Sequence, residues 1–268
     1  MALNEKFFNS ATVAAEPFFN TVTYPGDSAA TNDITGVGFQ PDLVWIKNRT
    51  KQGANWITDS VRGASKGIMA QSTSAEITSL PELMSSFNLD GFRVGYSAND
   101  TTNISTSAYV AWCWKAGGAP VSNGNGSITS QVSANADAGF SIVKYSGGNS
   151  SGTTVGHGLS SAPELIITKN ISASTSWPVF ITGGIPMNSA TFNTGFEPYW
   201  VMIKRTDSSG SWFMYDNVRG EDKYLFADSD GGEGPLDNID FTGTGFNLKQ
   251  NNASLNVTGG TYIYYAIA

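Results

Sequence analysis

Residues 38–49 read GFQPDLVWIKNR, and residues 195–204 read GFEPYWVMIK. A related stretch at 158–169, GLSSAPELIITK, has the same order of glycine, proline, apolar run and lysine. In all three stretches a lysine lies six residues after the proline: Lys47, Lys169 and Lys204. Such constant spacing indicates an internal repeat, and a repeat decides the fold because each copy must form the same structural unit.

The first and third copies continue in register beyond these stretches. Each contains an Asp-x-Val-Arg-Gly block, at 59–63 and at 216–220. Arg62 and Arg219 each lie 21 residues after the proline of their own copy. A second Gly-Phe pair and a closing aromatic run follow in both copies: Gly91-Phe92 with 109–114, and Gly245-Phe246 with 262–267.

The middle copy is incomplete. Residues 140–145 (FSIVKY) parallel residues 19–24 (FNTVTY), but the match breaks off near Trp177, and the third copy begins without such a front. Residues 118–137 are rich in Gly, Ser and Asn, a composition typical of linkers. We therefore predict four parts: an N-terminal arm (1–17), a first lobe (18–117), a linker (118–137) and a second, composite lobe (138–268).

The composition favours strands over helices. Charged residues make up only 14% of the chain, and 30 glycines accompany many Ser, Thr and Asn residues that suit tight turns. Short apolar and aromatic runs, with the length of strands, recur between turn residues at 43–47, 55–61, 92–96, 109–114, 141–145, 165–169, 199–204, 212–215, 224–226 and 262–267. We predict an all-β fold of two antiparallel, jelly-roll-like β-sandwich lobes with little helix.

One short helix of about two turns is predicted to cross the end of the first sandwich. Ser79, Pro81 and Glu82 have the spacing of a capping box with proline in the first turn, and Leu83, Met84 and Phe87 follow as its apolar side.

Charge excludes some functions. The net charge of −7 argues against nucleic-acid binding, which needs lysine and arginine to neutralise phosphates, and against attraction to anionic lipid. No apolar run is long enough to span a membrane, and Met1–Ser10 lacks the pattern of a secretory signal. The single cysteine, Cys113, lies between two tryptophans, where we expect a buried, unreactive thiol.

Few residues suggest chemistry. His157 is the only histidine, and we expect it in a turn, bonded to backbone, because a triad also needs a nucleophile in an elbow. One His and one Cys cannot hold zinc. Gly36 and Gly38 are expected to form a turn rather than a dinucleotide loop. We predict no catalytic, cofactor-binding or metal-binding residue, and no enzyme.

The two repeated arginines have two interpretations. Arg62 and Arg219 could clamp a carboxylate ligand, but each follows an aspartate, Asp59 or Asp216, by three residues. A structural ion pair is the favoured interpretation because the repeat retains both partners.

The acidic residues Asp228, Asp230 and Glu233, followed by Asp237 and Asp240, have no counterpart in the first copy. This stretch could bind calcium, could supply a glycosidase pair, or could be a solvated loop, which is the favoured interpretation.

The tryptophans raise the alternative of glycan stacking. Trp45, Trp56, Trp112, Trp114, Trp200 and Trp212 lie in predicted strands and are expected in the core. Trp177, in a loop-like stretch, is the candidate for a surface contact.

Residues 38–49, 59–63, 108–115 and 154–159 resemble a repeat of marine tailed-bacteriophage proteins that are described as tail-fibre-like or structural. The resemblance covers the chain from about residue 19 to its end, and the truncated middle copy departs from the usual pattern. It implies a virion component that assembles in the host cytoplasm.

From this resemblance we expect a tail or tail-fibre protein for assembly and host-surface glycan attachment. A capsid decoration or cement protein is the alternative, and a carbohydrate-active enzyme is a third. The expected partners are other virion proteins, further copies of the chain, a trimer included, and a host-surface glycan. The arm, with Phe7-Phe8, is expected to dock the protein to its neighbours.

Overall fold

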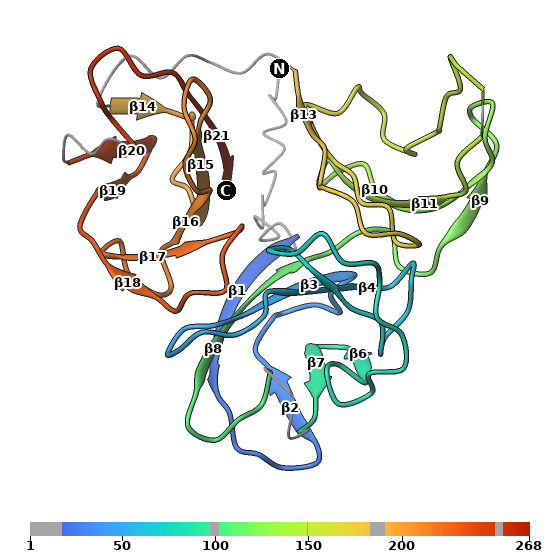
Figure 1. The fold of residues 1–268 in the computed structure, drawn as a ribbon, viewed down its shortest axis with the longest axis horizontal. Coiled ribbons are helices and arrows are strands. Elements are labelled where there is room, and N and C mark those ends of the chain that lie inside the picture. Colours follow the sequence, from blue (N-terminus) through green and yellow to red (C-terminus); the bar gives the residue numbers. More distant parts are fainter. Residues whose placement is uncertain (1–17, 97–101, 149, 183–190, 250–253) are drawn as a thin grey trace, which may run out of the picture.

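A computed structural model describes residues 18–96, 102–148, 150–182, 191–249 and 254–268. All regular elements in these ranges are strands, so the predicted all-β fold of antiparallel sheets is confirmed. The described residues contain no helix long and apolar enough to cross a membrane. Figure 1 shows three lobes around a common centre, where the prediction had two.

Lobe 1 (residues 18–116) is a sandwich of two sheets. Its five-stranded sheet runs in the order β1 (Phe19–Pro25), β8 (Ala108–Trp114), β3 (Leu43–Asn48), β4 (Trp56–Asp59) and β5 (Ile68–Met69). Its three-stranded sheet has the order β2 (Asn32–Thr35), β7 (Gly91–Val94) and β6 (Ser86–Asn88). Apolar side chains from both sheets, such as Tyr24, Phe92 and Tyr109, fill the space between them.

Lobe 3 (residues 191–268) repeats this sandwich. Its five-stranded sheet has the order β18 (Gly234–Pro235), β17 (Lys223–Phe226), β16 (Phe213–Asp216), β15 (Trp200–Arg205) and β21 (Tyr262–Ile267). Its three-stranded sheet has the order β14 (Thr191–Asn193), β20 (Gly245–Leu248) and β19 (Ile239–Thr242). The register repeats as well, since Leu43 pairs with Trp114 in lobe 1 and Trp200 pairs with Ile267 in lobe 3.

The middle lobe (residues 117–182) corrects the predicted organisation. The expected linker, 118–137, contains β9 (Val121–Asn123) and β10 (Ser130–Asn135), which form a sheet with β11 (Phe140–Tyr145). A two-stranded sheet of β12 (Leu165–Ile167) and β13 (Val179–Ile181) completes the lobe. A stretch of small polar residues forms a strand here because β10 is hydrogen-bonded to β9 on one side and to β11 on the other. Residues 138–268 do not form one composite sandwich.

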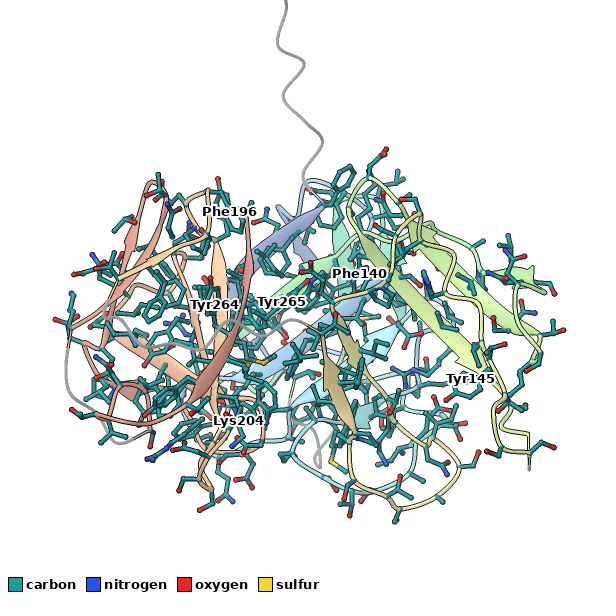
Figure 2. The ribbon with its side chains drawn as sticks, turned by 90° about the horizontal axis from the view of Figure 1, so that it is seen from above. Phe140, Tyr145, Phe196, Lys204, Tyr264 and Tyr265 are labelled. Carbon is teal, nitrogen blue, oxygen red and sulfur yellow. The ribbon has the colours of Figure 1, made fainter. Side chains whose placement is uncertain are left out.

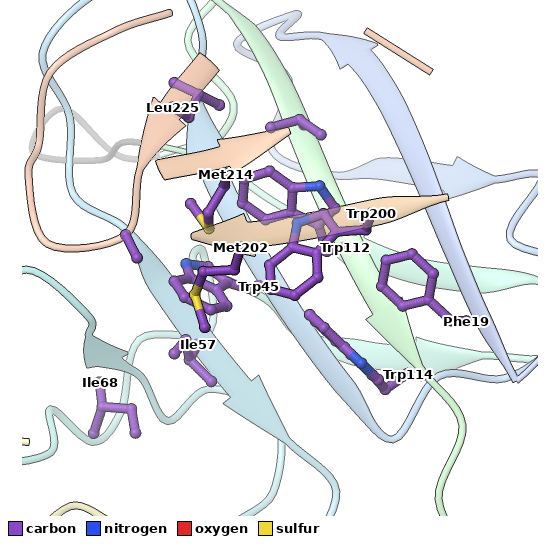
Figure 3. Packing of buried hydrophobic residues seen from close by; sticks show 12 residues of the cluster. Phe19, Trp45, Ile57, Ile68, Trp112, Trp114, Trp200, Met202, Met214 and Leu225 are labelled. Carbon is purple, nitrogen blue, oxygen red and sulfur yellow. The ribbon is translucent and has the colours of Figure 1, made fainter. Parts of the chain in front are cut away.

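The outer faces of the two five-stranded sheets pack against each other (Figure 3). Trp112 and Trp114 of β8 meet Trp200 of β15, with ring centroids 6.4 and 6.1 Å apart. The middle lobe adds Phe140, which stacks on Trp114 at 6.1 Å. We call this cluster the interlobe core. Aromatic pairs of this kind each contribute about 0.5–1.5 kcal/mol beyond the burial of their surface.

The predicted helix at Ser79–Phe87 is absent, and turns lead into β6 instead. The backbone groups of this stretch bond to distant residues: Gly95 N donates to Glu82 O at 2.7 Å, and Ser65 N donates to Met84 O at 2.7 Å. Tertiary hydrogen bonds thus replaced the local bonds that a two-turn helix needs, since so short a helix has little stability of its own.

Candidate functional site

The repeated arginines form buried ion pairs, as predicted. In lobe 1, Arg62 Nε donates to Asp59 Oδ2 at 2.5 Å, and Arg62 Nη2 donates to Ile57 O at 2.9 Å. The Arg62 backbone N–H donates to Asp59 Oδ1 at 2.8 Å. A third partner was not predicted: Arg62 Nη1 donates to Glu76 Oε1 at 3.0 Å.

Lobe 3 builds the same cluster. Arg219 Nε donates to Asp216 Oδ2 at 2.6 Å, and Arg219 Nη2 donates to Met214 O at 3.3 Å. Arg219 Nη1 donates to Glu233 Oε2 at 3.2 Å. The two glutamates were missed although the sequence carries a signal for them, because each lies 14 residues after its arginine.

Each glutamate also contacts another lobe through its backbone amide. We call residues 72–76 of lobe 1 and 229–233 of lobe 3 the docking loops. Glu233 N donates to Arg49 O of lobe 1 at 2.7 Å, and Glu76 N donates to Ile171 O of the middle lobe at 3.0 Å. Arg49 lies two residues after Lys47, and Ile171 lies two residues after Lys169, so the two contacts are equivalent.

We call these two contacts between lobes the joints. Further hydrogen bonds in the two joints also lie at equivalent positions. In the joint from lobe 3 to lobe 1, Gly53 N donates to Asp230 O at 2.8 Å, and Asn55 Nδ2 donates to Ser229 O at 2.8 Å. In the joint from lobe 1 to the middle lobe, the corresponding donors are Thr175 N to Thr73 O at 2.9 Å and Trp177 Nε1 to Ser72 O at 2.9 Å.

The repeat lysines belong to these joints. Lys47 Nζ donates to Ser229 O at 2.6 Å, and Lys169 Nζ donates to Thr73 O at 2.9 Å. Lys204, the third of the set, instead donates to Gly210 O of its own lobe at 2.6 Å. Burial lowers the pKa of Lys47 to about 8, although Asp230 and Asp228 favour its charged form.

Two of the acidic residues of lobe 3 serve the same contacts, and three bond within their own lobe. Glu233 bonds to Arg49 as well as Arg219, and Asp230 accepts a bond from Gln52 of lobe 1. Asp228 accepts from Trp212 N, whereas Asp237 and Asp240 both pair with Lys249. Within the described ranges, no three potential metal ligands come together. The geometry therefore favours a stretch that holds lobe 3 to lobe 1 over a calcium-binding loop.

The other candidate residues lie apart from one another. His157 Nδ1 accepts a bond from Leu159 N at 3.1 Å, as expected of a turn histidine. Cys113 is buried in lobe 1, and burial raises its pKa, so the prediction of a buried thiol is confirmed. Gly36 and Gly38 form a turn with positive φ, and both amides donate to Asp90.

The chain contains two Gly-x-Ser-x-Gly matches, at 63–67 and 148–152. The first lies in turns between β4 and β5, where Ser65 N donates to Met84 O at 2.7 Å. The second follows β11 in the middle lobe, and its residue 149 lies outside the described residues. The first match leads into β5 and lacks the strand-to-helix turn of a nucleophile elbow.

Trp177 was predicted to make a surface contact, and the structure corrects this. Its ring packs against the interlobe core, and its Nε1 donates to Ser72 O in the joint between lobe 1 and the middle lobe. Exposed apolar side chains of the middle lobe lie elsewhere, four of them on β12 and β13 and two on the other sheet: Ile166, Ile167, Val179 and Phe180, with Val121 of β9 and Tyr145 of β11. Phe180 alone leaves 59% of its surface exposed.

These features define a class of protein, a β-sandwich repeat whose recurring polar residues join one lobe to another. A family model described as a domain of unknown function (DUF7483) matches residues 14–191 and again 182–268, so the chain belongs to this family. The first match spans lobe 1 and the middle lobe together, and the second begins at residue 182 and covers lobe 3. No curated protein and no solved structure matches the chain.

Proposed function

We propose that this protein is a structural component of a bacteriophage particle, located in the tail or its fibres, where it takes part in assembly and in attachment to a host-surface glycan. The resemblance of its repeat to those of tailed-phage proteins is the source of this proposal. The observation that carries a structural role is the repeated joint: Lys47 and Lys169 occupy equivalent places in two contacts between lobes.

The joint supports assembly because it uses the repeat's polar residues for holding modules together. In both joints a docking loop contributes backbone carbonyls, and the next lobe contributes a lysine and backbone amides. Backbone groups bind through position rather than side-chain identity, so such a joint tolerates sequence change around it.

The exposed apolar residues on β12 and β13 support a contact with a further partner. The four side chains form two cross-strand pairs on opposite faces of one small sheet, Ile166 with Phe180 and Ile167 with Val179, and each exposes more than a third of its surface. Clustered apolar side chains of this kind often mark contact surfaces. The proposal assigns this sheet to a neighbouring particle protein.

The location of the protein in purified phage particles tests the proposal. Gold-labelled antibody against the protein should label tails in electron micrographs. Label on the capsid would support the decoration alternative instead, and particles without the protein would overturn the proposal.

A second test addresses the glycan. The purified protein is incubated with host-surface polysaccharide, and both binding and released oligosaccharide are measured. Binding without release is expected, and release would support the enzyme alternative. For the apolar sheet, Phe180→Asp should abolish incorporation into particles, whereas Val218→Asp, at an exposed apolar residue of lobe 3, should not.

A further inference from the structure

Strand β21 occupies in lobe 3 the place that β8 occupies in lobe 1, but it has one neighbour fewer. Strand β8 pairs with β3 on one side and with β1 on the other. Strand β21 pairs with β15 and is the last strand of its sheet among the described strands. Among the described strands, none therefore takes the position of β1 in lobe 3.

Burial shows the effect of the open position. From Tyr109 to Trp114 every residue of β8 is buried, whereas in β21 only Tyr262 is buried and the five residues from Ile263 to Ile267 are half-buried. Figure 2 shows Tyr265 on the side of β21 toward Phe140, and Tyr264 on the side of its own lobe. A strand beside β21 would cover both sides, as β1 does beside β8.

No described strand that leads into lobe 3 fills this position. In lobe 1, β1 immediately precedes β2, and its counterpart in lobe 3 should precede β14. The strand before β14 is β13, which is held by β12 through the pairs Leu165–Ile181 and Ile167–Val179. The described strands of lobe 3 therefore leave this edge of β21 uncovered.

The arm contains a sequence that matches β1. Residues 5–10 read EKFFNS, and residues 16–21, which lead into β1, read EPFFNT. The arm continues as ATV where β1 continues as VTY, so Phe8 corresponds to Phe19 and Val13 to Tyr24. The arm is thus related to the repeat, although it precedes the predicted lobes.

We infer that residues 7–13 form the missing edge strand on β21, and that they do so on β21 of a second copy of the chain. The known pairing of β1 with β8 fixes the register. Phe19 pairs with Trp114 and Thr23 with Val110, so Phe8 pairs with Ile267 and Thr12 with Ile263. Phe8 then joins the interlobe core, as Phe19 does, and Ala11 and Val13 face the core of lobe 3.

One polar contact supports this register. In lobe 1, Asn20 Nδ2 donates to Val37 O at 3.0 Å, which fastens β1 to the turn before β3. The counterpart of Asn20 in the arm is Asn9, and the counterpart of Val37 in lobe 3 is Thr194. The arm therefore retains the residue that makes this contact.

Chain length favours a second copy. Phe19 lies against Trp200, whose β-sheet partner is Ile267, so β1 begins at the Ile267 end of β21. With Val13 opposite Tyr262, the chain would have to return along the whole of β21, about 17 Å, before any sideways displacement. Four residues lie between Val13 and Phe18, and the five steps from one Cα to the next reach about 17 Å at full extension. A second copy has no such limit.

The inference does not depend on a phage particle and holds for the purified protein. The main experiment uses the full chain with Thr12→Cys and Ile263→Cys, which the register places directly opposite each other. Mild oxidation should link one chain to another, and non-reducing electrophoresis should show covalent dimers or larger species. The native Cys113 is buried and does not compete.

A matched control shifts the register by one residue. Ala11→Cys with Ile263→Cys places the two thiols on opposite faces of the sheet, so it should give at most a small fraction of the cross-link. Equal cross-linking in both variants, or none in either, would overturn the inference. A disulfide formed within a single chain would overturn the exchange between copies.

The second measurement needs no cysteine. Sedimentation of the full chain should show self-association that depends on concentration, whereas a variant lacking residues 1–13 should sediment as a single copy. Tryptophan fluorescence of the shortened chain should remain native, since the described lobes do not include the deleted residues. Self-association that persists unchanged after the deletion would contradict the inference.

Discussion

The indole Nε1 of Trp112 donates a hydrogen bond to Asp216 Oδ2 at 3.0 Å, from β8 of lobe 1 to the buried ion pair of lobe 3. The guanidinium of Arg219 lies over the same indole, 5.5 Å from its centre. A single tryptophan thus serves both the apolar packing between the lobes and the polar cluster that supports a docking loop.

We expect Trp112→Phe to destabilise the protein more than Trp45→Phe. Both side chains are buried in the interlobe core, but Trp45 Nε1 has no hydrogen-bond partner among the described residues. The substitution at 112 removes a bond to a charged acceptor and should cost about 1–2 kcal/mol more than the one at 45. Urea unfolding measures the difference, and equal costs would contradict a role for the Asp216 bond.

Arg219→Met should lower the free energy of unfolding by about 3 kcal/mol, because it leaves Asp216 and Glu233 without their shared cation in a buried place. Arg93→Met is the control, since Arg93 pairs with Asp33 on the surface and should change stability far less. Thermal unfolding of the two variants checks the contrast, which would be absent if the Arg219 cluster were solvated.

Lys47 should make the stability depend on pH. Its pKa is about 8 in the folded protein and 10.5 in the reference state, so between these values the unfolded chain binds more protons. The unfolding free energy then rises with pH, by about 2 kcal/mol from pH 8 to 10, relative to Lys47→Met. The difference between wild type and variant isolates this residue, and a flat difference would refute the prediction. Lys204→Met, at the equivalent position of lobe 3, serves as control.

Gly245→Ala should destabilise lobe 3 strongly. An added Cβ at 245 would lie 1.8 Å from Phe192 O, on the strand that pairs with β20, whereas an added Cβ at Gly243 would meet nothing within 4 Å. We expect a loss of about 3 kcal/mol for the first and little change for Gly243→Ala. Circular dichroism during thermal unfolding distinguishes them, and similar melting of both would argue against the close strand approach.

The repeat predicted the strands well because it carries their pattern twice. All ten expected runs coincide with strands or overlap them, including 109–114 in β8 and 262–267 in β21. The buried pairs of Arg62 and Arg219 followed from the same spacing.

The failures arose where tertiary contacts override local sequence. The capping pattern at Ser79 does not form a helix because the backbone there bonds to distant residues. The polar stretch 118–137 contains β10 because β11, which follows it, pairs with it. The division into three lobes also lay beyond the sequence, since an apolar run does not reveal which face meets another lobe. The acceptors in the joints were hidden for a simpler reason, because they are backbone carbonyls that any residue supplies.

Lobe 3 packs onto lobe 1, although the middle lobe separates the two in sequence. This arrangement has a consequence for synthesis. Lobe 1 can fold as soon as β8 is made, but the cover for Trp112 and Trp114 arrives with Trp200 and later residues. At the usual pace of translation this leaves the tryptophan face of lobe 1 exposed for roughly 5–20 seconds. The nascent chain thus passes through a stage prone to association, which ends only when lobe 3 emerges from the ribosome and covers the tryptophans.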